Sequence, residues 1–480
     1  MRVVHIAMEG ARMLMGNKGL MLARIAALSS MALSRAVAFS PTDTEHIQRF
    51  WSEPGRFMVQ APPERTTNGP WVVRLSPEGS VWLGNYNAAR GVGKNSIARA
   101  NLPSADTQRS WDAWLGQKVN YDRRQAGVAV AEANSRYLGR TVSSTIPAAS
   151  DPGPEPDGLK AFAGTPPDFA AAVVPNQYLV NFPDGTVIKI ADNPPMRANF
   201  PAYRFPQGVM SAGTPVKTLP EQELDDLFTA AGVSGSSQKV MKAVSILEGG
   251  FDSVNTYDTG FVSVGLIQFA CLSTGSGSLG LVLAREKQND PEAFENDFHR
   301  YGLDVTSSAA LVALDIEDGA ELAGPAAARQ IINDKRLVAV FQHAGQTSRA
   351  FRVAQIQIAK EQYFPGDDQV AFSMGGQTVT GKVSDFVRSE AGLAILMDRK
   401  VNTGKIDPLP SVLSQVATET GCHSPEELAS HEREIVLACR YRKDYTQDPT
   451  LTQPGEGNGR LDGVLASRHG TRNLRKKKSN

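Results

Sequence analysis

The sequence predicts an α+β protein, in which a small α+β domain precedes a larger, mainly α-helical domain with a small β-hairpin. Three observations support this class. Apolar residues recur at helical spacing from Pro220 onward. Two shorter segments before that point alternate around Pro-acid-Gly turns, as hairpins do. A chain of 480 residues also has room for about two to four domains.

Residues 42–143 are expected to form the small α+β domain. Trp71–Leu75 and Val81–Leu83 flank Ser76–Ser80, where proline presets one turn angle and glycine tolerates another, so we predict a hairpin. Apolar residues at helical spacing predict a helix from Trp111 to Tyr137.

Residues 144–176 are rich in Ser, Pro, Ala and Gly, which predicts a linker. The following segment, 177–219, is expected to be a β-hairpin extension, with strands at Tyr178–Phe182 and Val187–Ile190. Both turns share the order Pro-acid-Gly-hydroxyl-Val. A repeated β module would explain this, but two hairpins that share a common turn is the simpler interpretation, and we favour it.

The first 40 residues resemble a targeting segment. Lys18 and Arg24 precede the apolar run Ile25–Leu33, and Ala36–Ala38 fits a small-residue cleavage site. An amphipathic helix, or a start codon placed too early, would also explain this stretch.

The overall charge argues against a dedicated nucleic-acid binder. Lys+Arg and Asp+Glu each number 50, whereas such binders usually carry a basic face. No apolar run reaches the roughly 20 residues that span a bilayer. The basic tail, 466–480, predicts a solvated end, with contact to an anionic polymer as the alternative.

The three cysteines, Cys271, Cys422 and Cys439, are expected to be free thiols. A straight helix predicted from Ser424 to Arg440 would hold Cys422 and Cys439 roughly 20 Å or more apart. A disulfide needs Cα atoms within about 7 Å.

No cofactor or metal is expected. The G-x-G-x-x-G match at 275–280 lacks the βαβ context of a dinucleotide site, because residues 289–294 do not read as a strand. The seven histidines are scattered, without zinc-ligand spacing.

Glu248 is the strongest candidate for a chemical role. Ser236 or Ser237 can cap a helix, and Gly249–Gly250 should end it, so Glu248 lies at the C-terminal end. The helix would bury an apolar face formed by Val240, Val244 and Leu247. The negative end of the helix dipole and partial burial both disfavour a carboxylate there. Such an environment suits a general acid.

A second carboxyl follows on a predicted hairpin. Asp258–Gly260 is typical of a turn, and Phe261–Val264 of a strand. A helix that ends in Glu248, followed by this hairpin, would place two carboxyls across one groove, as glycosidic cleavage requires. Asp252 is the alternative, but it follows the helix end too closely to cross a groove easily.

These residues resemble the lysozyme-like superfamily. In phage-type lysozymes a helix-terminal Glu-Gly precedes Tyr-x-Asp-Thr-x-Gly and Thr-x-Gly; here Glu248–Gly249, Tyr257–Gly260 and Ser263–Gly265 occur in that order. Tyr257 adjoins the Asp directly, and Ser263 replaces the usual Thr but keeps the hydroxyl that would hold the nucleophilic water.

The stretch that follows resembles bacterial chitosanases of the same superfamily, although their Glu-to-Asp spacing is longer and their Tyr-to-Pro spacing differs by one residue. The resemblance covers about residues 220–440. Its segments are Ser263–Phe269, Thr274–Gly275 with Leu279, Arg352–Gln355, Tyr363–Pro365, and Asp398–Val401 with Gly404.

The resemblance implies a lysozyme-like glycoside hydrolase domain at 220–465, acting on a β-1,4-linked amino-sugar polymer, with bacterial peptidoglycan favoured. Glu248 would be the acid of an inverting reaction, and Asp258 with Ser263 would activate water. Four further side chains are expected to line the groove: Tyr257, Gln268, Phe269 and Tyr363. The protein would then be exported or act on the cell envelope. We also expect the fragment 220–440 to fold and cleave alone.

Three alternatives remain open. A chitosanase should carry carboxylates beyond the pair, because chitosan is cationic. A lytic transglycosylase needs only the glutamate, so the aspartate should hardly matter. A non-catalytic glycan-binding or structural particle component would keep the fold without turnover.

Overall fold

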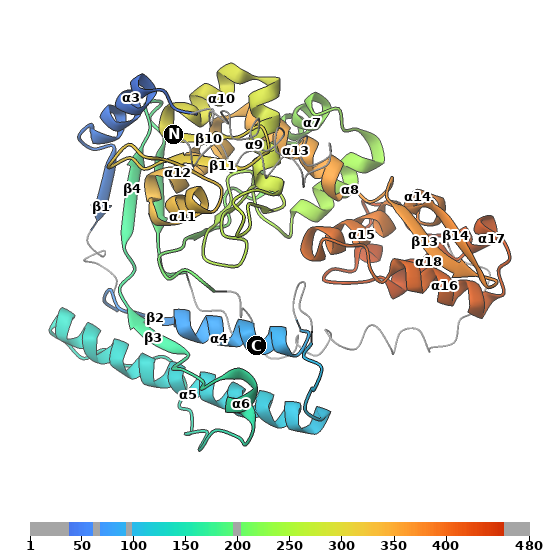
Figure 1. Cartoon of the computed structure of the whole chain (residues 1–480), viewed down its shortest axis with the longest axis horizontal. Helices are drawn as coiled ribbons and strands as arrows, with labels where there is room; N and C mark the ends of the chain where they lie inside the picture. The colour runs from blue at the N-terminus through green and yellow to red at the C-terminus, as the bar shows by residue number, and fades with distance from the viewer. Residues whose placement is uncertain (1–37, 61–67, 93–97, 195–202, 456–480) are drawn as a thin grey trace, which may run out of the picture.

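A computed structural model describes residues 38–60, 68–92, 98–194 and 203–455 (Figure 1). The chain is α+β, with 48% helix and 14% strand in several small antiparallel sheets. Most of the targeting-like segment 1–40 and all of the basic tail 466–480 lie outside the described residues. None of the helices in the described ranges has the length and apolar character needed to cross a membrane.

The main body is built around one continuous hydrophobic core. Helix α13 packs against α9 and α7, and α11 packs against the sheet β10-β11-β12. The helices of this part are α7 (Glu221–Ala230), α8 (Gly235–Ser245), α9 (Ser278–Asn289), α10 (Pro291–Asp297), α11 (Pro325–Asn333), α12 (Lys335–Thr347) and α13 (Arg349–Tyr363). The strands are β10 (Leu303–Val305), β11 (Leu311–Leu314) and β12 (Glu321–Ala323).

A C-terminal lobe follows α13 and joins the main body where α15 packs against α8 (Figure 1). It contains the hairpin β13 (Gln369–Met374) and β14 (Gln377–Lys382). Its helices are α14 (Val383–Phe386), α15 (Glu390–Thr403), α16 (Leu409–Thr420), α17 (Pro425–Ala429) and α18 (Glu432–Ala438).

The three cysteines are free and buried, as predicted. The straight helix expected between Cys422 and Cys439 is wrong, however. The chain turns at Ser430 and His431, which separate α17 from α18.

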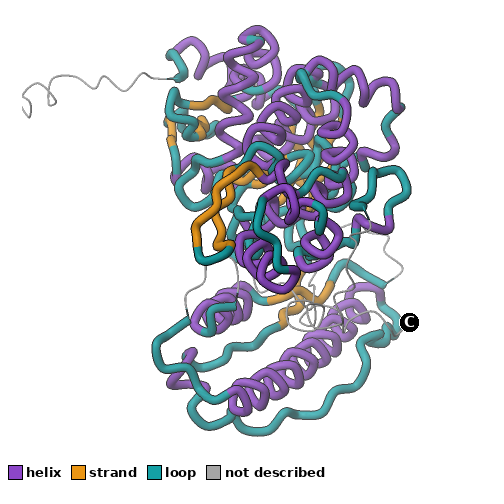
Figure 2. The backbone as a smooth tube through the Cα atoms, turned by 90° about the vertical axis from the view of Figure 1, so that its right-hand side faces the viewer, coloured by secondary structure: helices purple, strands orange, loops and turns teal. Residues whose placement is uncertain are grey.

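An N-terminal module, residues 72–173, lies beside the main body and contains the long helix α5 (Figures 1 and 2). Its elements are β2 (Val72–Leu75), α4 (Pro77–Ala89), α5 (Ala105–Leu138), α6 (Leu159–Ala163) and β3 (Ala170–Val173). The helix predicted from Trp111 to Tyr137 is therefore confirmed, and it extends further at both ends.

The hairpin predicted around Ser76–Ser80 is wrong. Ser76 instead caps α4, because its side chain accepts a hydrogen bond from the Gly79 amide at 3.0 Å, and Pro77 occupies the first helical turn. Strand β2 pairs with β3, almost a hundred residues later in the sequence. Because this segment is not a hairpin, the interpretation that two hairpins share a common turn is also wrong.

The linker predicted at 144–176 is also wrong. It contains α6 and β3, and Leu159 and Phe169 are fully buried in the core of the module. A few large apolar residues thus anchor a segment whose average composition is typical of a linker.

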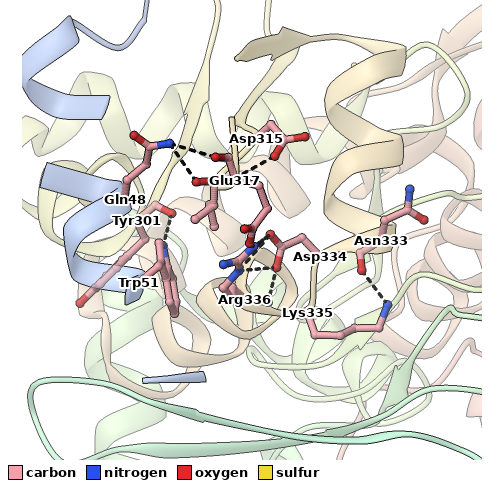
Figure 3. Close-up of polar contacts among 10 residues, drawn as sticks. Gln48, Trp51, Tyr301, Asp315, Glu317, Asn333, Asp334, Lys335 and Arg336 are labelled. Atoms are coloured by element: carbon pink, nitrogen blue, oxygen red, sulfur yellow. Dashed lines mark hydrogen bonds and ion pairs between the residues drawn. The ribbon is translucent and has the colours of Figure 1, made fainter. Parts of the chain in front are cut away.

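The second predicted hairpin is confirmed as β4 (Gln177–Asn181) and β5 (Val187–Ala191). It forms a sheet with β1 (Phe57–Gln60), which follows helix α3 (Pro41–Ser52). Figure 3 shows how α3 is fixed to the main body: Trp51 Nε1 donates to the Tyr301 carbonyl at 3.0 Å, and Gln48 donates to the Ile316 carbonyl at 3.1 Å.

Candidate active site

Glu248 leaves the C-terminal end of α8, as predicted. The helix is capped by Ser234 rather than Ser236 or Ser237. After Ser245 the chain tightens into a turn, in which the Glu248 amide donates to the Ser245 carbonyl at 3.0 Å. Gly249 then adopts a φ of +135°, which glycine accepts readily.

The apolar face of α8 is only partly as expected. Val240 and Val244 are fully buried, but Leu247 is 39% exposed, because it follows the helix end and faces a cavity beside Glu248. Ile246 is 53% exposed on the same cavity.

Asp258 lies on the predicted hairpin, between β7 (Val254–Asn255) and β8 (Ser263–Val264). Its carboxylate accepts hydrogen bonds from Asn255 Nδ2 at 2.9 Å and from the Gly260 amide at 2.8 Å. The two strands belong to a small sheet with β6 (Met210–Ser211) and β9 (Phe269–Ala270). The sheet therefore fixes the turn that carries the carboxylate.

Ser263 and Asp258 lie close together, on either side of Gly260. A Cβ atom at position 260 would be 2.5 Å from Ser263 Oγ and 3.1 Å from Asp258 Oδ1. The Ser263 hydroxyl and the Asp258 carboxylate therefore both lie next to the position that a side chain at residue 260 would occupy.

One cavity of about 770 Å³ brings the candidate residues together. Glu248, Asp258 and Ser263 all line it. The predicted groove residues Tyr257 and Gln268 also line it. A carboxyl from a helix end and a carboxyl from a hairpin therefore share one cavity, as the sequence predicted.

Two predicted groove residues lie elsewhere. Phe269 is fully buried, and its ring packs edge-on against Tyr363 with centroids 6.3 Å apart. Burial raises the pKa of Tyr363, although a hydrogen bond with Ser278 opposes this. Neither Phe269 nor Tyr363 is among the described residues that line the cavity, so both belong to the packing behind it.

The alternative acid, Asp252, is a structural residue. It is 2% exposed and accepts hydrogen bonds from the Thr214 amide, the Thr214 hydroxyl and Gln346 Nε2, at 2.7, 3.2 and 3.0 Å. Its oxygens are occupied in linking its own loop to the Thr214 segment and to α12.

Three residues from the C-terminal lobe complete the surroundings of Glu248: Asp398, Asn402 and Arg442. None of the three was predicted from the sequence to have a role in the site. Arg442 contacts Glu248 Oε1, and Asn402 Nδ2 lies 3.3 Å from the same oxygen. Arg442 also contacts Asp398 Oδ1 through Nη2 and, at 2.9 Å, through Nε. Asp398 is fully buried on α15. Its chitosanase-like segment was the one signal in the sequence; Arg442 belonged to no motif.

The charges around Glu248 differ from those expected of an isolated helix end. Burial lowers the pKa of Arg442, but its bonds to Asp398 and the charge of Glu248 raise it above its ordinary value. The guanidinium therefore stays charged beside Glu248. Arg442 contacts the carboxylates of both Glu248 and Asp398, so two carboxylates share one guanidinium.

The Arg-x-x-Gln segment on α13 supports the hairpin from behind. Gln355 is fully buried; its side chain accepts from the Leu266 amide at 2.9 Å and donates to the Phe251 carbonyl at 3.0 Å. Gly265 adopts a φ of +86° directly against Gln355. These bonds fix the positions of β7 and β8 relative to α13.

The cavity extends beyond the fragment 220–440 that was expected to act alone. Part of its wall is formed by Met210, Ser211, Ala212, Pro215, Val216 and Lys217, and Arg442 lines it next to Glu248. In the described part of the chain, no group of three His, Cys, Asp or Glu side chains is placed to bind a metal ion. Searches against protein-family models, curated proteins and solved structures find no match to this chain.

Proposed function

We propose that this protein is a glycoside hydrolase that cleaves β-1,4 bonds in an N-acetylated amino-sugar polymer, with bacterial peptidoglycan the favoured substrate. The observation that carries the proposal is the cavity in which Glu248 and Asp258 occur with a hydroxyl, Ser263, beside the second carboxylate. Most glycoside hydrolases use two carboxyls that flank the scissile bond, and this cavity contains such a pair of residues.

Glu248 donates its proton to the leaving oxygen, and Asp258 accepts a proton from the attacking water. The Ser263 hydroxyl holds that water beside Asp258. As the general acid, Glu248 would enter the reaction protonated. A sugar bound in the cavity would displace Arg442 from Glu248, and the guanidinium would keep its contact with Asp398. Water arriving from the Asp258 side gives inversion at the anomeric carbon.

The lining of the cavity favours an N-acetylated sugar over chitosan. Among the described lining residues the carboxylates are Glu248 and Asp258, and the cations Lys217 and Arg442 balance them. A cationic polymer would need additional carboxylates. The exposed side chains of Ile246 and Leu247 offer an apolar surface to a pyranose ring or an acetyl methyl group.

Asp258 and Ser263 favour hydrolysis over the lytic transglycosylase reaction, which needs no activated water. Peptidoglycan lies outside the cytoplasmic membrane, so this function requires the protein to act at the cell envelope.

The test is dye release from labelled peptidoglycan by the full-length chain, with mass analysis of the products. We expect wild type to release sugars with ordinary reducing ends, and Glu248→Gln to release none while unfolding at the same temperature. Glu221→Gln, which changes an exposed glutamate on α7, should match wild type.

Three other outcomes would each support one of the alternative functions. Anhydro-sugar products, with Asp258→Asn fully active, would indicate a transglycosylase. Cleavage of chitosan alone would indicate a chitosanase. Binding of peptidoglycan without turnover would indicate a glycan-binding protein.

A further inference from the structure

The hairpin that carries Asp258 is packed into the core of the N-terminal module. A second hydrophobic core, separate from that of the main body, unites the module with two tyrosines from outside it, Tyr203 and Tyr257. Tyr257 is 6% exposed, and its ring centroid lies 5.9 Å from that of Tyr203. The module contributes the other large side chains of this core: Leu75, Trp82, Tyr86, Trp111, Leu115, Leu159, Phe162 and Phe169.

A strap, residues 203–209, lies between the module and the hairpin. The backbone amides of Arg204 and Phe205 both donate to the Tyr257 carbonyl, at 2.6 and 3.1 Å. Val209 exchanges two bonds with Thr256, one through the backbone and one through the threonine hydroxyl, each of 3.0 Å. Thr256 and Tyr257, which directly precede Asp258, are thus both hydrogen-bonded to the strap.

The strap is in turn attached to α4. Arg204 Nη1 lies 3.4 Å from the Ser80 carbonyl, and its side chain crosses α4 at Gly84. A Cβ atom at position 84 would be 2.5 Å from Arg204 Nη2. Burial lowers the pKa of Arg204, which is consistent with a guanidinium enclosed between two parts of the fold.

We propose that the N-terminal module is part of the catalytic unit: through the strap and Tyr257, it positions Asp258 opposite Glu248. Tyr203, Arg204 and Gly208 are not among the described residues that line the cavity, so they are positioning residues. This inference rests on the proposed function only where it concerns turnover, because the mechanical link between α4 and the hairpin exists regardless of the reaction.

The link predicts a specific kinetic signature. Displacing the strap should move Asp258 but leave Glu248, Arg442 and the apolar wall in place. Substrate binding should then change little, while water activation suffers, because a misplacement of about 1 Å can cost roughly 100-fold in rate.

The experiment compares Gly208→Ala with Gly116→Ala in the full-length chain. A Cβ at Gly208, in the strap, would lie 2.5 Å from Tyr257 Cα and 2.6 Å from the Thr256 carbonyl oxygen, so backbone must shift, whereas a Cβ at Gly116 has nothing within 4 Å. Gly208→Ala should lower kcat on peptidoglycan by about 10- to 100-fold with KM within about twofold, and Gly116→Ala should change neither. In an Asp258→Asn background, Gly208→Ala should cause no further loss, since both act on one group.

Hydrogen exchange supplies a readout that needs no turnover. Gly208→Ala should speed amide exchange in the segment 254–262 but not in α15, and Gly116→Ala should speed neither. Tyr203→Ala should reproduce the effect, and Tyr203→Phe, which keeps the ring, should leave exchange normal; this pair replaces Gly208→Ala if that variant does not fold.

Unchanged exchange at 254–262 in both Gly208→Ala and Tyr203→Ala would overturn the inference, whatever the turnover. An equal loss of kcat in the wild-type and Asp258→Asn backgrounds would also overturn it, because the effect would not pass through Asp258. Faster exchange in a protein whose wild type cleaves nothing would support the link and contradict the proposed function alone.

Discussion

Arg442→Met removes the guanidinium that joins Glu248 to Asp398 across two parts of the fold. Asp398 is fully buried, and without Arg442 its Oδ1 would retain only the Asn402 amide at 3.3 Å. Its Oδ2 has no hydrogen-bond partner among the described residues. The substitution would therefore leave a buried carboxylate without its cation.

Breaking a buried ion pair in this way typically costs 3–5 kcal/mol. The side chain of Arg442 is 33% exposed, so solvent compensates in part, and we expect a loss near the low end, about 3 kcal/mol. Asp398→Asn removes the charge that would be stranded. The double variant should recover about 2 kcal/mol relative to Arg442→Met, and its loss should be smaller than the sum of the two single losses by the coupling energy of the pair.

Urea unfolding of the four proteins at pH 7, followed by circular dichroism, measures this coupling. A loss below about 0.5 kcal/mol for Arg442→Met, within the range of ordinary surface substitutions, would refute the reasoning. So would a double variant whose losses simply add. Either result would show that Asp398 reaches solvent or another cation once Arg442 is absent.

Three further predictions follow from particular contacts. Gly260→Ala places a methyl group 2.5 Å from Ser263 Oγ and 3.1 Å from Asp258 Oδ1; we expect kcat on peptidoglycan to fall at least about tenfold with little change in KM, and wild-type kinetics would contradict the proposed water site. Burial and the neighbouring Asp297 raise the pKa of Glu286 from 4.5 to about 10, so the folded state keeps a proton that the unfolded state loses above about pH 4.5, and the stability of wild type falls as pH rises from there to about 10. Glu286→Gln should therefore gain about 1–3 kcal/mol at pH 8 and almost nothing at pH 4, and an equal gain at both, measured by urea unfolding, would show that Glu286 is already ionised. The fragment 220–440 lacks Arg442 and the wall at 210–217, so a soluble fragment should release no dye under conditions in which the full chain does; full activity of the fragment would show that neither contributes.

The sequence predicted the local parts of the site because those parts are local. Glu248 at a helix end, Asp258 in a turn and Ser263 on a strand lie within 16 residues of each other in the sequence, and spacing alone constrains such a segment. Arg442 is 194 residues from Glu248, and no periodicity connects the two. Phe269 and Tyr363 were assigned to the groove as aromatic residues, but aromatic side chains fill cores at least as often.

Two predictions for the N-terminal module were wrong, the hairpin at Ser76–Ser80 and the linker at 144–176, and both errors have one physical origin. Ser-Pro-Glu-Gly favours both a turn and the first turn of a helix, and the choice depends on whether the serine caps the following amides. Ser76 does so, and α4 then presents Trp82 and Tyr86 to a core completed by Phe169 and Tyr257. Those partners are far apart in the sequence, so composition alone described 144–176 as a linker and the module as independent of the site.

The most direct measurement of the central claim is the anomeric configuration of the first product, followed by proton NMR as the full-length protein digests soluble peptidoglycan fragments. An acid and a water-activating carboxylate on opposite sides of the sugar, roughly 6.5–9.5 Å apart, predict that the α-anomer appears first and the β-anomer grows in later by mutarotation. Initial release of the β-anomer would contradict the assignment of Asp258 as the residue that activates water. The absence of any new anomeric signal, with folded protein present throughout, would contradict the proposed glycoside hydrolase itself.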